Sequence, residues 1–171
     1  MVGLPLLELS VRALVWLIED TWRSTVAAAT AVLPADAQVT LLYVAASDAE
    51  GVVEGTRAGL LGRPRPPHGR PAPLRGISEE AARGLLADAE AELGRPARGL
   101  VRRGRLEREV LAAARQADLL VMARDGDRSR LGPRSLGPHA RFVVDHAPCS
   151  VLLVWPGETP ALSTIPPPPR H

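Results

Sequence analysis

The sequence predicts an open, doubly wound α/β domain with about five parallel strands and helices on both faces of the sheet. Apolar runs that are almost uninterrupted occur at residues 12–18, 39–44, 118–122 and 150–155. Such runs are typical of parallel strands that are buried on both faces. Segments with helical signals lie between them, and the 171 residues suffice for one domain with a proper core.

The first half of the chain predicts a strand, a helix and a second strand. Residues 12–18 (RALVWLI) form a short apolar run that ends at Glu19-Asp20-Thr21, and we expect a buried strand there. Residues 25–33 are rich in Ala and stop before Pro34, which indicates a helix and its end. Residues 39–44 have β-branched side chains at both ends and predict the second strand.

The composition then changes at residues 51–76, where Pro, Gly and Arg leave little to bury. We interpret this stretch as a flexible insertion within a single domain over residues 1–156. Residues 157–171 are rich in Pro and predict a disordered tail.

The second half predicts alternating helices and strands. Ser78 followed by Glu79 and Glu80 is a capping signal for a helix that ends near Gly94. The expected elements after it are a weak strand at 97–104, a helix at 106–117, strands at 118–122 and 150–155, and a helix at about 138–146.

Composition excludes several classes of function. All 21 basic residues are Arg, so a phosphate loop of the GxxxxGK[ST] type is absent. The net charge of +2 does not indicate nucleic acid, and the Arg-rich stretch at 63–75 lacks aromatic residues for base stacking. Because the chain has one cysteine, no apolar run long enough for a membrane helix and no signal-peptide pattern, we expect a cytoplasmic protein without a membrane partner.

Catalytic and metal-binding patterns are weak. Ser135 lies in GPRSLG, which is close to but not the GxSxG pattern, and the strand–turn–helix context that this nucleophile needs is lacking. His146 and Cys149 form a single HxxC pair, which is too few ligands for a metal site. We therefore expect no enzyme activity and no bound metal.

In sheets of this kind, ligands bind beyond the carboxyl ends of the strands. The candidate segments are therefore Glu19-Asp20-Thr21 after the first strand and the loop at 123–138 after the fourth. That loop contains three glycines and four arginines.

Three stretches, VTLLYV (39–44), ARQADLLVMARDG (114–126) and GPHARFVVDHAPCSVLLVW (137–155), carry a resemblance to the universal stress protein family. It covers most of residues 77–156 and, more weakly, residues 12–44. The resemblance implies a Rossmann-like sheet of order 3-2-1-4-5. It also implies a homodimer formed through the last strand, with the interface residues Val151, Leu152, Leu153, Val154 and Trp155.

Some members of that family bind ATP, and their motif resembles G-x-x-G-x9-G-[S/T] after the fourth strand. In this chain the motif positions fall on Ala123, Gly126, Gly137 and Pro138, with ten residues instead of nine before Gly137. The resemblance also implies an acid at Glu19 or Asp20 and adenine contacts from Val44 and Met122. Because some members of the family bind ATP and others have lost that ability, ATP is a candidate cofactor and not a certain one.

The departures from this motif change the expected chemistry. Pro138 has no N–H and no hydroxyl to offer a phosphate, and Ala123 adds a Cβ where a ligand would approach the backbone. Asp125 adds a charge that would repel a triphosphate.

The arginines of the loop, Arg124, Arg128, Arg130 and Arg134, could replace the lost donors or could be solvated surface charges. Two hypotheses therefore stay open. One is a non-catalytic regulatory protein that binds an adenine nucleotide weakly, and the other is a homodimeric interaction module that has lost nucleotide binding.

Overall fold

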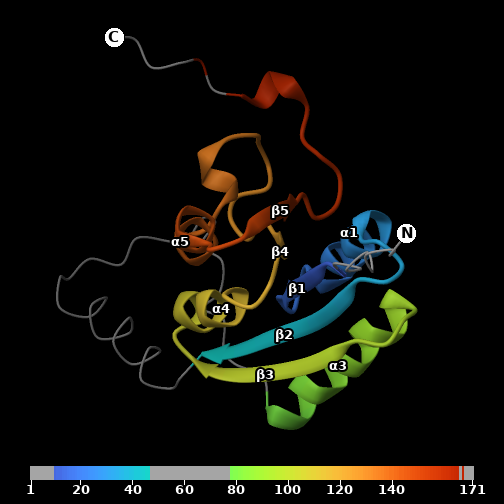
Figure 1. The fold of residues 1–171 in the computed structure, drawn as a ribbon. Coiled ribbons are helices and arrows are strands. Elements are labelled where there is room, and N and C mark those ends of the chain that lie inside the picture. The colour runs from blue at the N-terminus through green and yellow to red at the C-terminus, as the bar shows by residue number, and fades with distance from the viewer. Residues whose placement is uncertain (1–9, 47–77, 166, 168–171) are drawn as a thin grey trace, which may run out of the picture.

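The computed structural model describes residues 10–46, 78–165 and 167. In that part of the chain, a parallel sheet lies between two layers of helices (Figure 1). The predicted insertion at 51–76 lies outside the described residues, so its flexibility stays a prediction.

The sheet has five strands in the order β3-β2-β1-β4-β5, and all neighbouring strands are parallel. This confirms the predicted fold class and strand order. The strands are β1 (Arg12–Leu17), β2 (Gln38–Ala46), β3 (Arg98–Gly104), β4 (Leu119–Ala123) and β5 (Ser150–Val154).

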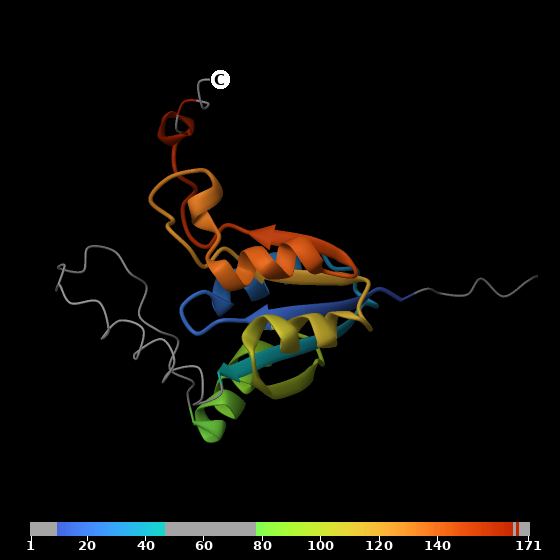
Figure 2. The same cartoon turned by 90° about the vertical axis from the view of Figure 1, so that its left-hand side faces the viewer.

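The helices lie on both faces of the sheet. They are α1 (Trp22–Val32), α3 (Glu79–Leu93), α4 (Leu106–Ala114) and α5 (Pro138–His146), with short 3-10 helices η1 (Pro133–Ser135) and η2 (Leu162–Thr164). Helices α1 and α3 cover one face, whereas α4 and α5 cover the other (Figures 1 and 2).

Two apolar layers form the core because every strand of the centre is covered on both sides. Val15, Leu41 and Tyr43 point toward α1 and α3, whereas Trp16 and Leu42 point toward α4 and α5. A central strand thus needs an apolar residue at every position, which explains the uninterrupted apolar runs in the sequence.

The helix ends follow local chemistry. At the start of α3, the Ser78 hydroxyl accepts a hydrogen bond of 3.2 Å from the Ala81 amide, as the capping signal predicts. At its end, Gly94 has a φ of 69°, a left-handed conformation that glycine adopts without a steric cost.

The boundaries differ from expectation at a few places. Helix α1 begins three residues earlier than predicted, and α4 ends at Ala114 rather than near residue 117. Residues 157–165 of the predicted disordered tail are described and include η2, where the Thr164 hydroxyl accepts a 3.0 Å hydrogen bond from the Leu131 amide. Among the described residues, no helix is long and apolar enough to cross a membrane.

Candidate functional site

The loop between β4 and α5 lies at the carboxyl end of the sheet, where a ligand is expected. It folds back on itself through two backbone hydrogen bonds, from Gly126 N to Ser135 O (3.0 Å) and from Asp127 N to Arg134 O (2.8 Å). A Cβ built on Gly126 would lie 2.3 Å from the carbonyl oxygen of Arg134. Glycine is therefore required at this position by the packing of the loop itself.

The first turn of α5 is already occupied by a carboxylate of the loop. The Gly137 amide, at the N-cap of α5, donates a 2.7 Å hydrogen bond to Oδ1 of Asp125. Pro138 follows at the first helical position and has no N–H to donate. Burial raises the pKa of Asp125, although the hydrogen bond from Gly137 opposes this shift.

Most of the loop arginines have partners within the protein. Arg124 donates to the Ser135 hydroxyl, Arg128 lies 3.4 Å from Asp20, and Arg130 lies 3.3 Å from Asp127. Within the described part of the chain, Arg134 makes no side-chain ion pair. The arginines thus tie the loop to its surroundings rather than converging on one point.

The two candidate acids both lie after β1 but have different partners. Glu19 accepts a 2.7 Å hydrogen bond from the hydroxyl of Tyr43. Asp20 faces Arg128, which links the end of β1 to the loop after β4. The structure therefore brings the acid positions and the loop together, as the sequence predicts.

The residues expected beside an adenine ring are in the core. Val44 is 4% exposed, and Met122 and Ala123 are fully buried. As placed, these side chains present almost no surface to a ligand, so an adenine contact at Val44 or Met122 stays a prediction.

The residues predicted at a dimer interface lie at one edge of the sheet. Val151, Leu152, Leu153 and Val154 belong to the edge strand β5 and are half-buried. Trp155 follows the strand, and its ring lies 4.9 Å below the Arg124 guanidinium. This contact joins the edge of the sheet to the loop.

Two features of the site escaped sequence reasoning. The sequence alone predicts only a repelling charge at Asp125, whereas in the structure its carboxylate accepts a hydrogen bond from the amide at the start of α5. Glu107 is 6% exposed and lies 3.1 Å from Nδ1 of His139 and 2.8 Å from Arg105. An acid in the first turn of a helix was the available signal for Glu107, but its partners come from elsewhere in the fold.

The side chains of a possible hydrolytic set have other partners. The Ser135 hydroxyl donates to the carbonyl of Gly132 and accepts from Arg124, and His139 pairs with Glu107. Among the described residues, no group of His, Cys, Asp and Glu side chains is arranged to hold a metal ion.

The strand order and the glycine-containing loop after β4 define a small, doubly wound α/β domain with its candidate site at the carboxyl edge of the sheet. The universal stress protein family model matches residues 8–154. The chain therefore belongs to the universal stress protein family.

Several solved structures share this fold. The hypothetical protein MJ0577 is 16% identical, with 88% of this chain and 100% of that chain covered and a TM-score of 0.60. UspA from Lactobacillus plantarum is 18% identical, with 84% and 97% covered and a TM-score of 0.52. A universal stress protein in complex with cAMP is 16% identical, with 86% and 98% covered and a TM-score of 0.54. No curated protein matches the chain in sequence.

Proposed function

We propose that this chain is a non-catalytic regulatory protein in which Asp125 takes the position of a nucleotide phosphate. Adenine nucleotides then bind weakly, and their phosphates add little affinity. The observation that carries this proposal is the 2.7 Å hydrogen bond from the Gly137 amide to the Asp125 carboxylate. A helix N-terminus binds anions through its free amides, and here an internal anion holds that place.

The magnitudes favour exclusion of a phosphate. A hydrogen bond to a charged group contributes about 1.5–3 kcal/mol, and Pro138 has already removed one possible donor. Two like charges about 4 Å apart near a protein surface repel each other by about 4 kcal/mol. The repulsion between Asp125 and a phosphate thus exceeds the gain from one remaining amide.

The ligand class to test is an adenine nucleotide, because a structural relative with the same fold is a complex with cAMP. The proposed lack of catalysis is supported by the partners of Ser135 and His139, since Ser135 bonds to Gly132 and Arg124 whereas His139 bonds to Glu107. A site that binds an adenine nucleotide weakly and carries no catalytic residues fits a regulatory role in which the protein responds to the ligand without converting it.

The test is isothermal titration calorimetry with adenosine, AMP, ADP and ATP. For the natural sequence we expect weak binding that differs less than about threefold between adenosine and ATP, which is under 1 kcal/mol. Asp125→Asn removes the charge and Asp125→Ala also frees the Gly137 amide, so both should increase the affinity for ATP at least about tenfold, or 1.4 kcal/mol, without changing that for adenosine.

Asp127→Asn is the matched control, because Asp127 lies in the same loop and its carboxylate contacts only Ser129 and Arg130 among the described residues. It should leave the preference between adenosine and ATP unchanged. Binding of ATP by the natural sequence far more tightly than adenosine would refute the proposal.

A second candidate function is that of a homodimeric interaction module, and the position of β5 favours it. This strand lies at the edge of the sheet with four half-buried apolar residues, and an unpaired apolar edge invites pairing with another strand. Size-exclusion chromatography with light scattering should show a dimer at micromolar concentration. Val151→Lys on β5 should convert the dimer to a monomer, whereas Val101→Lys on the opposite edge strand β3 should leave the dimer intact. A natural protein that is monomeric at this concentration would contradict this function.

A further inference from the structure

A cavity lies at the opposite end of the sheet from the loop. It has a volume of about 310 Å³, is open to solvent on one side, and is lined by residues of β1, β2, β3 and the segment from α4 to residue 117. Arg12, Gln38 and Arg98, which line it, are the first residues of their strands. The cavity is therefore at the amino end of the parallel strands and does not share residues with the candidate nucleotide site.

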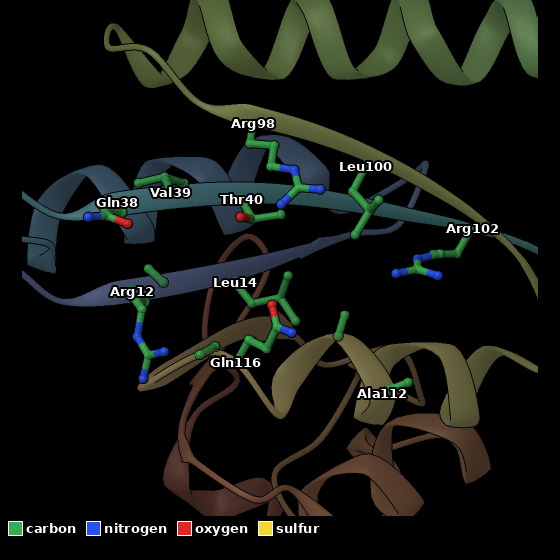
Figure 3. A pocket seen from close by; sticks show the side chains of 13 residues that line it. Arg12, Leu14, Gln38, Val39, Thr40, Arg98, Leu100, Arg102, Ala112 and Gln116 are labelled. Atoms are coloured by element: carbon green, nitrogen blue, oxygen red, sulfur yellow. The ribbon is translucent and has the colours of Figure 1, made fainter.

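The sequence explains why there is space here. On β3, Arg98, Leu100 and Arg102 alternate onto the face that α4 covers, while the residues between them face α3. The opposite wall is built from alanines, namely Ala112, Ala113 and Ala117. Because these side chains are small, they leave room below the long side chains of β3, as Figure 3 shows.

The cavity is electropositive. None of its lining residues is acidic, and three of them are arginines. Arg12 is neutralised by Asp118, with Nη2 and Oδ1 2.7 Å apart. Arg98 and Arg102, in contrast, make no ion pair or hydrogen bond through their side chains within the described part of the chain, and Figure 3 shows both guanidinium groups directed into the space between β3 and α4.

The other groups in the cavity complement an anion with an apolar body. Leu14 and Leu100 contribute an apolar surface, and Thr40 lies directly across from Arg98 in the sheet register. Gln38 and Gln116 add amide groups at the rim. The lining thus combines polar and charged groups with a smaller apolar surface, which suits a ligand that carries both a charge and an apolar part.

The two arginines of β3 that line the cavity lie on the same face of the strand. Arg98 and Arg102 are four residues apart, which is about 13 Å along a strand. A single guanidinium binds a single carboxylate through two parallel hydrogen bonds, so one of the two arginines suffices to hold an acid.

We propose that this cavity binds a small organic acid. Its carboxylate pairs with Arg98 beside Thr40, its apolar part lies on Leu14 and Leu100, and Arg102 closes the far end. The site is independent of the proposed nucleotide function, because it shares no residue with the loop after β4.

The test uses octanoate as the probe and its methyl ester as the neutral counterpart, followed by amide chemical shifts in nuclear magnetic resonance spectra. We expect saturable shifts at Thr40, Leu100 and Ala113 with octanoate and not with the ester. Arg98→Gln should weaken octanoate binding at least tenfold, and Arg98→Lys should restore part of it. Arg115→Gln is the control, because Arg115 is exposed near α4 but does not line the cavity.

Three results would overturn the proposal. The first is the absence of saturable shifts at tens of millimolar octanoate, and the second is equal binding of octanoate and its ester. The third result would show that the two arginines only protect the edge of the sheet, because β3 is an edge strand and charged side chains keep such strands from pairing with other chains. If Arg98→Gln combined with Arg102→Gln produces larger species in light scattering while octanoate binding is unchanged, the arginines protect the edge and do not bind an acid.

Discussion

Gly126→Ala tests whether the loop glycine serves the packing of the loop or the approach of a ligand. The new Cβ would lie 2.3 Å from the Arg134 carbonyl oxygen, and real Cβ atoms essentially never come closer than 3.0 Å to another heavy atom. The loop must therefore open by at least 0.7 Å. That movement would stretch the hydrogen bonds from Gly126 to Ser135 and from Asp127 to Arg134.

Overpacking of this kind costs about 1–3 kcal/mol of unfolding free energy. For a chain of this size, each kcal/mol lowers the midpoint of thermal unfolding by about 2–4 °C. Gly84→Ala is the matched control, since Gly84 lies inside α3 and a Cβ there meets no atom within 4 Å. It should stabilise the protein by about 0.5–1 kcal/mol.

The assay is urea unfolding followed by circular dichroism, with both variants measured in the absence of any ligand. If Gly126→Ala changes the unfolding free energy by less than about 0.5 kcal/mol, the size typical of an unconstrained surface position, the packing argument is wrong. The glycine would then have to be explained by the ligand alone.

Three further predictions concern charge and capping. Hydrogen bonds from Arg12 lower the pKa of Asp118 from 3.8 to about 2. The contribution of Asp118 to the unfolding free energy is therefore present above pH 3.8 and is lost as the pH falls through 2. Asp118→Asn should remove this part of the pH dependence from acid-unfolding curves. Burial raises the pKa of Asp125 above 3.8, so the contribution of Asp125 to the unfolding free energy is greatest below pH 3.8 and is lost as the pH rises through the raised pKa. Urea unfolding at several pH values should therefore show that Asp125→Asn becomes more stable relative to the natural sequence as the pH increases. A difference that stays constant with pH would contradict this. Ser78→Ala should cost about 1 kcal/mol because the hydroxyl that accepts from Ala81 is lost, and Ser78→Asp should retain most of the stability in thermal unfolding.

The central strands were predictable because their environment is uniform. Trp16, Leu42 and Met122 face one apolar layer while their neighbours in the strands face the other. Burial on both faces of the sheet therefore requires an uninterrupted run of apolar residues, which the sequence shows directly. The edge strand β3 gave a weaker signal, since its apolar residues Leu100 and Val101 are flanked by glycines and arginines on a half-exposed strand.

The site was predictable in place but not in detail. Parallel strands bring Asp20 and the loop after β4 to the same edge, and the structure confirms this through the pair of Asp20 with Arg128. The role of Asp125 depends on a contact with Gly137, twelve residues away, and on the path of the loop between them. No local pattern of residue types determines such a path.

The contact between Arg124 and Trp155 couples the end of the edge strand β5 to the loop after β4. One guanidinium lies on the indole at the end of β5 and also donates to Ser135 inside the loop. A second chain that covers the indole and an anion that draws Arg124 into the loop would act on the same side chain. By thermodynamic linkage, each bound anion must change the dimerisation constant by the same factor by which dimerisation changes the affinity of that site for the anion.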